Sequence, residues 1–357
     1  MSASNRSKAP KKPVSNAKKI FRIVLLVCTA ISLYFVPWSV VWAYLQPLPD
    51  TIQEQVDDAT NKGFDGIIVY VDQKGKAPKT YTAGYHNTEK KIPARPDALF
   101  KIASNDKLYT ALAIAKLVRS GKLSLDKTLA DYFPELADRI EHADKITIKM
   151  MVQHRSGIPN YTNTYMYWAN PKDNDEERLD LVLDTPASFE PDTDYEYSNT
   201  NYLLLSYLIE KASGTTRFEY LKKEVLTPLG LNNTYGSIHD VDMDDVMSGY
   251  YVGYDADLKT DDNDCMLATA EDLGKFLRAL NEGTVFTDQK ERDIYSSIYR
   301  YDHTGLIPGY QSISRYDKEL DAVVIQFTNT VNFEGYNWNI SEVLYNRVIK
   351  LLEKEKS

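Results

Sequence analysis

The chain of 357 residues contains few cysteines and few histidines, and outside its first 22 positions it has fewer basic than acidic residues. Its two cysteines are far apart, and Cys28 lies inside a long apolar run, so Cys265 has no disulfide partner in the rest of the chain. The five histidines are not spaced as metal ligands, and no phosphate-binding Walker loop or dinucleotide-binding glycine motif is present. The sequence therefore predicts neither a metal nor an organic cofactor.

The charges are distributed unevenly. Residues 1–22 contain seven basic side chains and no acid, whereas the remaining chain has 35 basic residues against 51 acids. A surface with this excess of negative charge repels phosphate groups. We therefore expect no nucleic acid partner.

Residues 23–45 form an apolar run of 23 positions without a charge. A helix of this length spans about 30 Å of hydrocarbon, and Pro37 is tolerated better in such helices than in soluble ones. Trp38 and Trp42 suit the membrane interface, and the basic residues 1–22 keep the N-terminus cytoplasmic. We expect a single-pass cell-membrane protein with an extracytoplasmic domain. The alternative, a cleaved signal peptide, is disfavoured because the run is long and no small-residue cleavage site follows.

The sequence of the remaining chain predicts an α+β domain. Residues 46–63 form a linker and a first helix, and residues 64–357 form the domain. Strand patterns occur near both ends of this domain, whereas its interior is mostly helical. The strand-like ranges are 64–73, 78–87 and 310–330, and the helical ranges are 108–119, 202–212, 270–280 and 340–356. We expect one antiparallel sheet built from both chain ends, with a helical subdomain against it.

A serine followed three residues later by a lysine occurs three times, beginning at Ser15, Ser104 and Ser124. Ser15 lies in the basic tail, and Ser124 follows "RSGKL", where a helix is expected to end, so that the serine is expected to cap the next helical turn. Ser104 differs because apolar residues precede it and a helix with an apolar face follows. The motif alone is uninformative, and only this context distinguishes Ser104.

At the start of a buried helix, the N–H group of Ser104 would stabilise a developing oxyanion. Lys107, one turn later, is expected on the same side, where a partly desolvated amine could act as the base. The alternative interpretation is a helix-capping serine and a solvated lysine.

Two later segments carry further candidates. The pattern Tyr-x-Asn occurs three times, but only Tyr197 leads directly into a long apolar helix, where a phenol near an ammonium can shuttle a proton. His303, Thr304 and Gly305 precede strand-like residues, and the glycine would let a substrate backbone approach an edge strand closely. Because the chain has 26 tyrosines, the alternative interpretation of Tyr197 taken singly is a packing role, and that of His303 is a structural role.

Taken together, these motifs resemble those of the penicillin-recognising serine hydrolases, the family of class C β-lactamases and D-alanyl-D-alanine carboxypeptidases. The three motifs stand in the same order, and the resemblance extends to "MVQHRSGIPNY" and "TAEDLGKFLRAL" and covers residues from 64 to the C-terminus. It implies a β-lactamase/transpeptidase-like fold. One departure is His303, which stands where β-lactamases have lysine and is more similar to the carboxypeptidase and esterase branches.

The resemblance also implies roles for individual residues. Those implied to be catalytic are Ser104, Lys107 and Tyr197, and those implied to bind substrate are Asn199, His303, Thr304, Gly305 and Leu306. Ser104 would attack a carbonyl while Lys107 and Tyr197 share its proton. The N–H groups of Ser104 and Leu306 would hold the oxyanion. Asn199 would bind the acyl side, and His303 and Thr304 would orient a terminal carboxylate.

The expected function is that of an envelope acyl-serine hydrolase, most simply a D-alanyl-D-alanine carboxypeptidase acting on peptidoglycan peptides, with β-lactams as acylating ligands. An esterase of D-alanyl or other esters and a class C-like β-lactamase are alternatives of the same class. A non-catalytic envelope binding module on the same fold is the alternative of another class.

Overall fold

The computed structural model describes residues 15–263 and 265–356, so the first 14 residues of the expected basic tail lie outside the described part. The chain divides into two compact units, which meet between Gln46 and Pro47. The expected domain boundaries at residues 22, 45 and 63 remain predictions.

The first unit contains helices α1 (Asn16–Tyr34) and α2 (Trp38–Leu45). The two helices are bent by 78° with respect to each other, and among the described residues no single helix is long and apolar enough to cross a membrane, although the bent pair passes by length and composition. The expectation of one continuous helix over residues 23–45 is therefore wrong. Pro37 explains the break, because its ring disfavours helical backbone in the preceding residue and it has no N–H to donate.

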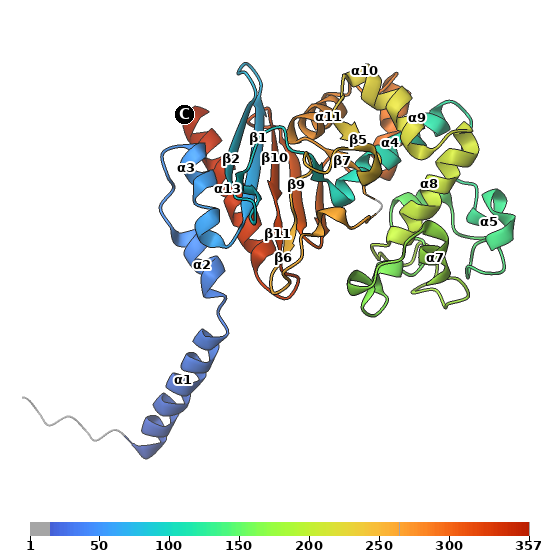
Figure 1. Ribbon diagram of the computed structural model, residues 1–357. Coiled ribbons are helices and arrows are strands. Elements are labelled where there is room, and N and C mark those ends of the chain that lie inside the picture. Colours follow the sequence, from blue (N-terminus) through green and yellow to red (C-terminus); the bar gives the residue numbers. More distant parts are fainter. Residues whose placement is uncertain (1–14, 264, 357) are drawn as a thin grey trace, which may run out of the picture. The chain divides into compact units, whose positions relative to one another are not determined.

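The second unit is built around an antiparallel sheet of six strands in the order β3-β2-β1-β10-β9-β8 (Figure 1). The strands are β1 (Gly66–Gln73), β2 (Lys79–Asn87), β3 (Ile92–Pro93), β8 (His303–Ile307), β9 (Tyr310–Asp317) and β10 (Ala322–Thr328). At its centre, β1 pairs with β10, so that Ile67 lies opposite Thr328. The prediction of an α+β fold with a sheet from both chain ends is confirmed.

Helices cover both faces of this sheet. Figure 1 shows α3 (Ile52–Asp57) and α13 (Asn337–Lys356) on one face and α11 (Ala270–Glu282) on the other. Arg347 of α13 donates a 2.6 Å hydrogen bond to Gln55 of α3. On the opposite face, Gly274 of α11 lies against Tyr70 so closely that a Cβ atom would stand 2.3 Å from the ring. The glycine therefore sets the distance between α11 and the sheet.

The helical subdomain is centred on α4 (Asp106–Arg119) and α8 (Asn199–Ser213), most of whose side chains are buried. The remaining α-helices are α5 (Leu129–Tyr132), α6 (Ile148–Val152), α7 (Asp175–Asp180), α9 (Arg217–Leu221), α10 (Thr227–Leu229) and α12 (Gln289–Ile298). Short strands β4 (Phe100–Lys101), β5 (Thr234–Tyr235) and β7 (Leu267–Ala268) form a small antiparallel sheet, and β6 (Tyr250–Tyr251) pairs in parallel with β11 (Thr330–Val331).

The two other serine-lysine pairs have local structural roles. The Ser15 hydroxyl accepts the N–H of Lys18 and caps α1. Contrary to expectation, Ser124 does not cap a helix, because α5 is capped by Thr128, whose side chain accepts the N–H of Asp131. Ser124 instead forms a turn in which its hydroxyl accepts the N–H of Asp126 at 3.4 Å.

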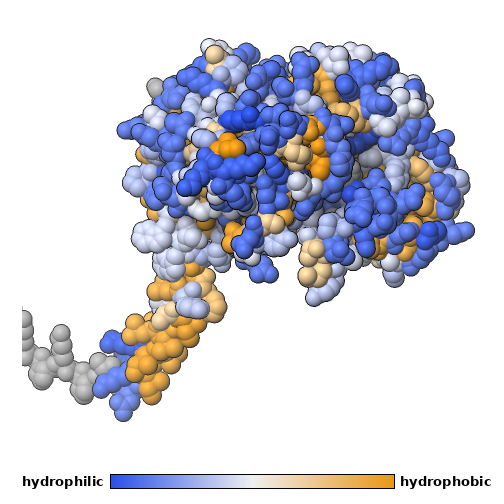
Figure 2. All heavy atoms as spheres, viewed as in Figure 1, coloured by the Kyte–Doolittle hydropathy of each residue, from blue (hydrophilic) through white to orange (hydrophobic). Residues whose placement is uncertain are grey.

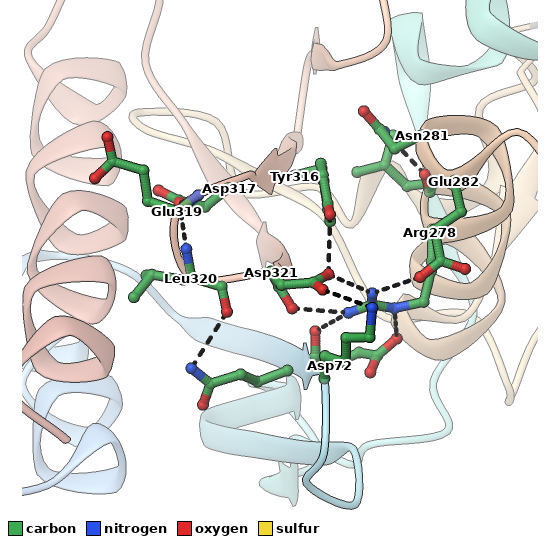
Figure 3. A network of polar contacts seen from close by, with 12 residues as sticks. Asp72, Arg278, Asn281, Glu282, Tyr316, Asp317, Glu319, Leu320 and Asp321 are labelled. Carbon is green, nitrogen blue, oxygen red and sulfur yellow. Dashed lines mark hydrogen bonds and ion pairs between the residues drawn. The ribbon is translucent and has the colours of Figure 1, made fainter. Parts of the chain in front are cut away.

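A polar network ties α11 to strands from both chain ends (Figure 3). Arg278 of α11 forms ion pairs with Asp72 of β1 and, at 3.1 Å, with Asp321 in the turn between β9 and β10. Tyr316 of β9 donates a 2.9 Å hydrogen bond to the same Asp321 carboxylate. Because the three charged side chains are largely shielded from water, this network fixes the helix relative to the sheet.

Candidate active site

Ser104 lies in the short 3-10 turn η2 (Ala103–Asn105), between β4 and α4. Ala103 has a left-handed backbone with φ of 49°, which is uncommon for a residue other than glycine. The turn is held by its neighbours: the N–H of Ala103 donates to Cys265 Sγ at 3.2 Å, and the Asn105 amide donates to Ser312 Oγ of β9 at 2.7 Å. These contacts fix the serine at the boundary between helix and sheet.

Three predicted residues meet at the Ser104 hydroxyl. Tyr197 donates a 2.6 Å hydrogen bond to Ser104 Oγ, and Lys107 Nζ lies 3.4 Å from the same oxygen. Tyr197 comes from the loop before α8, which is 93 residues further along the chain. A serine in contact with both an amine and a phenol has two groups through which its proton can leave.

The side chain of Lys107 is buried and surrounded by polar and aromatic partners. The residue is 8% exposed, and its Nζ donates a 2.9 Å hydrogen bond to Asn199 Oδ1. The same Nζ lies 5.1 Å from the centre of the Tyr197 ring and 5.2 Å from that of Tyr202. These partners orient the amine toward Ser104.

Both the oxygen and the nitrogen of the Asn199 side-chain amide form hydrogen bonds. Besides accepting from Lys107, it donates from Nδ2 to Thr162 Oγ1 at 3.1 Å and to Asn160 Oδ1 at 3.3 Å. Its backbone N–H also donates to Asn160, at 3.0 Å. The predicted role in binding an acyl group therefore requires the substrate to replace or share the Thr162 bond. Asn160 and Thr162 were not predicted, because nothing in their sequence pattern links them to Asn199.

Gly305 of β8 allows the strand to lie directly against the serine-bearing turn. A Cβ atom at this position would stand 2.4 Å from the Ile102 carbonyl oxygen and 2.9 Å from Ala103 Cβ. Only glycine fits this approach. The predicted importance of Gly305 thus has a packing reason in addition to any contact with substrate.

The N–H of Leu306 points away from the sheet. β8 is an edge strand, and a two-residue turn joins Ile307 to its partner Tyr310. In a hairpin of this kind the pair next to the turn is hydrogen-bonded, so the following pair, Leu306 and Gln311, directs its N–H groups outward. Leu306 is 37% exposed and borders the same cavity as Ser104. This geometry allows the Leu306 N–H to act as an oxyanion donor.

The ring of His303 has both nitrogens in contact with partners. Nδ1 lies 2.5 Å from the carbonyl oxygen of Thr304, and Nε2 lies 2.9 Å from the Tyr299 hydroxyl. Burial lowers the pKa of His303 to about 3, so the imidazole is neutral at physiological pH. A neutral ring with both nitrogens engaged does not supply the positive charge that a lysine would bring to this position.

His154 forms the back of the Tyr197 site. Its Nδ1 accepts the N–H of Ser198 at 3.1 Å, and its ring stacks on that of Tyr197 with centres 4.4 Å apart. Burial lowers the pKa of His154 to about 3. The histidine occurs in "MVQHRSGIPNY", but its contact with Tyr197 joins segments far apart in the sequence and could not be inferred from that stretch.

The hydroxyl of Ser104 opens into a cavity of about 360 Å³. One side is aromatic and formed by a continuous row of ring contacts, from Tyr161 through Tyr167 and Trp168 to Phe333. Another side contains the ion pair between Asp106 and Arg217. The cavity therefore offers both apolar and charged walls to a ligand.

Comparison with known proteins agrees with this geometry. The sequence model of the family described as Beta-lactamase matches residues 48–297. The chain belongs to the beta-lactamase family. This match covers α4, α8 and α11 but ends before β8, so His303, Thr304, Gly305 and Leu306 lie beyond it.

Other members of the beta-lactamase family are recognisable in sequence. The chain is 28% identical to the protein flp of Staphylococcus aureus (strain MW2) over 205 residues, which make up 54% of this chain and 41% of that protein. It is 26% identical to a penicillin-binding protein of Bacillus subtilis (strain 168) over 281 residues, 71% of this chain and 59% of that protein. The chain thus spans about half the length of these curated relatives.

The fold is also that of a solved structure. The D-amino acid amidase from Ochrobactrum anthropi SV3 superimposes with a TM-score of 0.75 and 24% sequence identity, covering 86% of this chain and 98% of that one. At this level of identity the likeness shows the fold alone. The predicted membership among penicillin-recognising serine hydrolases is confirmed by the family match, whereas the roles of individual residues remain predictions.

Within residues 15–263 and 265–356, no group of three or more histidine, cysteine, aspartate and glutamate side chains is placed to hold a metal ion. The chemistry that the described side chains can provide is acyl transfer. Ser104 is a potential nucleophile, Lys107 and Tyr197 are potential proton carriers, and the Leu306 N–H is a potential oxyanion donor.

Proposed function

We propose that this chain is an acyl-serine hydrolase that acts on D-alanyl-D-alanine ends of peptidoglycan peptides. The observation that carries this proposal is the contact of one serine oxygen with two proton carriers, Tyr197 at 2.6 Å and Lys107 at 3.4 Å. If Tyr197 and Lys107 served only packing, there would be no reason for a phenol and an amine to contact the same serine hydroxyl.

In the first step, Ser104 Oγ attacks the carbonyl carbon of the scissile bond, and its proton passes to the pair formed by Lys107 and Tyr197. The N–H groups of Ser104 and Leu306 stabilise the oxyanion. The C–N bond then breaks, and Tyr197 delivers the proton to the leaving amine. An acyl group remains esterified to Ser104.

In the second step, a water molecule attacks the acyl-enzyme while Tyr197 accepts its proton. The ester bond breaks, and the proton returns to Ser104. Asn199 keeps Lys107 oriented in both steps through the 2.9 Å hydrogen bond to Nζ. β-Lactams would acylate Ser104 by the same first step, because their strained amide presents the same carbonyl.

Two similar proteins support this choice of substrate class. The Bacillus subtilis relative is a penicillin-binding protein, and the Ochrobactrum enzyme is a D-amino acid amidase. The first protein is similar to this chain in sequence, and the second is similar to it in fold. The substrate class of this chain is inferred from these likenesses and from the serine site.

We also propose that the first unit anchors the protein in the cell membrane, with the N-terminus cytoplasmic and the second unit outside. Figure 2 shows apolar side chains along the surface of α1, and Ile23, Leu26 and Ile31 are each more than half exposed. Exposed apolar side chains of this kind require a lipid or protein environment. Carbonate extraction of membranes should release a chain starting at Pro47 but not the full chain, and release of both would contradict the anchor.

The test of the proposed reaction is labelling by a fluorescent penicillin of the wild type and of Ser104→Ala. Ser124→Ala is the matched control, because Ser124 also precedes a lysine by three residues but lies in a surface turn. We expect the control to be labelled like the wild type and Ser104→Ala not to be labelled. Labelling that survives Ser104→Ala would contradict the assignment of the nucleophile.

Turnover separates the alternatives. Release of D-alanine from a D-alanyl-D-alanine peptide supports the carboxypeptidase. Hydrolysis of D-alanyl esters alone indicates an esterase, and hydrolysis of penicillin without accumulation of label indicates a β-lactamase. A wild-type protein that neither turns over these substrates nor takes up label is a binding module and overturns the proposal.

A further inference from the structure

Lys101 is a charged side chain in the interior of the protein, three residues before Ser104. It lies on β4, and only 1% of its surface is exposed. Lysine is almost never buried to this extent unless its charge has partners. Burial lowers the pKa of Lys101 to about 8, although nearby carboxylates, among them that of Asp261, oppose this shift. The amine is therefore largely protonated at neutral pH.

The Lys101 ammonium joins β4 to a loop formed by residues 258–263. Its Nζ donates hydrogen bonds to the carbonyl oxygens of Leu258, at 2.9 Å, and Asp261, at 2.6 Å. It also lies 3.4 Å from Asn263 Oδ1. Hydrogen bonds from a charged donor are roughly twice as strong as neutral ones. The buried ammonium therefore fixes the loop to the strand that leads into the serine turn.

The next two residues of the serine turn are bonded to the same part of the chain. The N–H of Ile102 donates to the carbonyl oxygen of Met266 at 3.0 Å, and the N–H of Ala103 donates to Cys265 Sγ at 3.2 Å. Ala103 has the left-handed backbone described above, and such a backbone persists only where its surroundings hold it. The loop at residues 258–263 therefore continues toward the residues that hold the strained position before the nucleophile.

Lys101 also contacts the hairpin that carries the Leu306 N–H. Its Nζ lies 5.0 Å from the centre of the Tyr310 ring, where an ammonium is attracted to an aromatic face. Tyr310 pairs with Ile307, the residue after Leu306, and its hydroxyl donates to the carbonyl oxygen of Met247 at 2.8 Å. The ammonium thus lies where β4, the loop and the β8–β9 hairpin meet.

These elements provide the nucleophile, the proposed oxyanion donor and part of the cavity wall. Asn263 and Cys265 border the Ser104 cavity, as does Leu306. Attack on a carbonyl requires the serine oxygen and the oxyanion donor at a fixed separation, and a displacement of about 1 Å can cost roughly 100-fold in rate. A side chain that holds these elements together can therefore control the rate without contacting substrate.

We propose that Lys101 is a positioning residue for acylation, whose buried ammonium holds the serine turn and the β8–β9 hairpin in the relative position that the attack requires. The inference rests on the proposed function and adds to it a residue that does not contact the reacting atoms. Without the ammonium, the carbonyl oxygens of Leu258 and Asp261 lose a charged donor, and the loop is released from β4.

The experiment follows acylation of the full chain at increasing penicillin concentrations, which separates the limiting acylation rate from the apparent dissociation constant. For Lys101→Met we expect the limiting rate to fall roughly 10- to 100-fold, with little change in the dissociation constant. Lys101→Arg, which keeps a positive charge and N–H donors, should recover part of the rate. If Lys101→Met does not fold, Lys101→Gln, which keeps a donor without the charge, provides the same comparison.

Lys116→Met is the matched control. The Lys116 side chain is 10% exposed, and its Nζ donates to the carbonyl oxygen of Val285 at 3.0 Å and to Glu291 at 2.9 Å. It lies toward the C-terminal end of α4, away from the serine turn at the other end. This variant also removes a buried ammonium, so it should lose stability but acylate at the wild-type rate.

A second measurement does not depend on acylation. When Cys28 is replaced by serine, Cys265 is the only cysteine in the chain, and it is 7% exposed. In this background, alkylation of Cys265 by iodoacetamide should be faster in Lys101→Met than in the wild type or in Lys116→Met, because the loop before it is released. Equal alkylation rates in Lys101→Met and the wild type would contradict the inference.

The outcomes separate this inference from the proposed function. The inference is wrong if the limiting rate of Lys101→Met is unchanged, if Lys116→Met falls equally, or if only the dissociation constant changes. In each of these cases the acyl-serine mechanism stands. If the wild type takes up no penicillin, the proposed function fails and the inference on acylation fails with it.

Discussion

The Tyr197 hydroxyl donates a 2.6 Å hydrogen bond to Ser104 Oγ, and the Tyr197 ring is supported by the stacked imidazole of His154. This pair joins the helical subdomain to the turn next to the sheet. Its geometry leads to the first prediction.

Replacement of Tyr197 by phenylalanine removes the hydroxyl but keeps the ring that packs on His154. We expect the rate of acylation by a fluorescent penicillin to fall by about 10²- to 10⁴-fold, the usual contribution of a positioned proton carrier. Thermal unfolding should change little. Tyr195→Phe is the control, because this neighbouring residue is 52% exposed and should acylate at the wild-type rate. An acylation rate of Tyr197→Phe close to that of the wild type would exclude Tyr197 as a proton carrier.

Replacement of Gly305 by alanine places a methyl group 2.4 Å from both the Ile102 carbonyl oxygen and Ser312 Oγ. The strand and the serine-bearing turn have to move apart, so we expect a loss of about 1–3 kcal/mol of stability and a strong loss of acylation. Leu306→Ala is the comparison, because it retains the backbone N–H and alters a residue that is 37% exposed. Wild-type acylation by Gly305→Ala would show that the close approach is not required.

The two buried histidines make stability depend on pH in the acid range. Burial lowers the pKa of His154 and of His303 from 6.5 to about 3 in the folded protein. Between these values the unfolded chain binds protons that the folded chain does not, so stability is retained above pH 6.5 and lost as the pH falls toward 3. Each histidine contributes a slope of at most about 1.4 kcal/mol per pH unit.

Urea denaturation at about pH 6.5, 5.5 and 4.5 measures this slope. His154→Gln should reduce it, whereas substitution of His239 by glutamine should not, because the His239 side chain is 75% exposed. A slope that is the same in the wild type and in His154→Gln would show that other groups control the acid transition.

The Arg278 network supports a prediction on stability alone. Arg278→Met leaves the carboxylates of Asp72 and Asp321 without their common partner, at side-chain exposures of 15% and 29%. We expect a loss of about 1–3 kcal/mol in the free energy of unfolding. Lys275→Met, on the same helix, breaks a pair whose side chains are 46% and 56% exposed and should cost less than about 0.5 kcal/mol. Equal losses in the two variants would contradict a special role for the network.

The sequence was informative where a single segment determines its own structure. The runs of apolar and β-branched residues in β1 and β10 and the buried face of α4 predicted the sheet and the central helix, since such patterns are set by residues close together in the sequence. The break at Pro37 is equally local. The sequence alone is compatible with a continuous helix at Pro37, because proline is tolerated where neighbouring helices support a membrane span.

The meeting of Tyr197 with Ser104 was predicted only through the family resemblance, and other features that depend on contacts between distant segments could not be predicted. The neutral state of His303 results from burial in the folded protein, and no pattern around His303 indicates that burial. The contacts of Thr162 and Asn160 with the Asn199 amide are likewise between distant segments.

The pairing of β1 with β10 also determines the order in which the chain can fold. During synthesis from the N-terminus, β1 can pair with β2 at once, but its other neighbour is complete only after residue 328 has been made. Until then one edge of β1 offers unpaired N–H and C=O groups to any other extended chain. Because such distant pairing slows folding, the newly made chain has to be protected from aggregation for most of its synthesis.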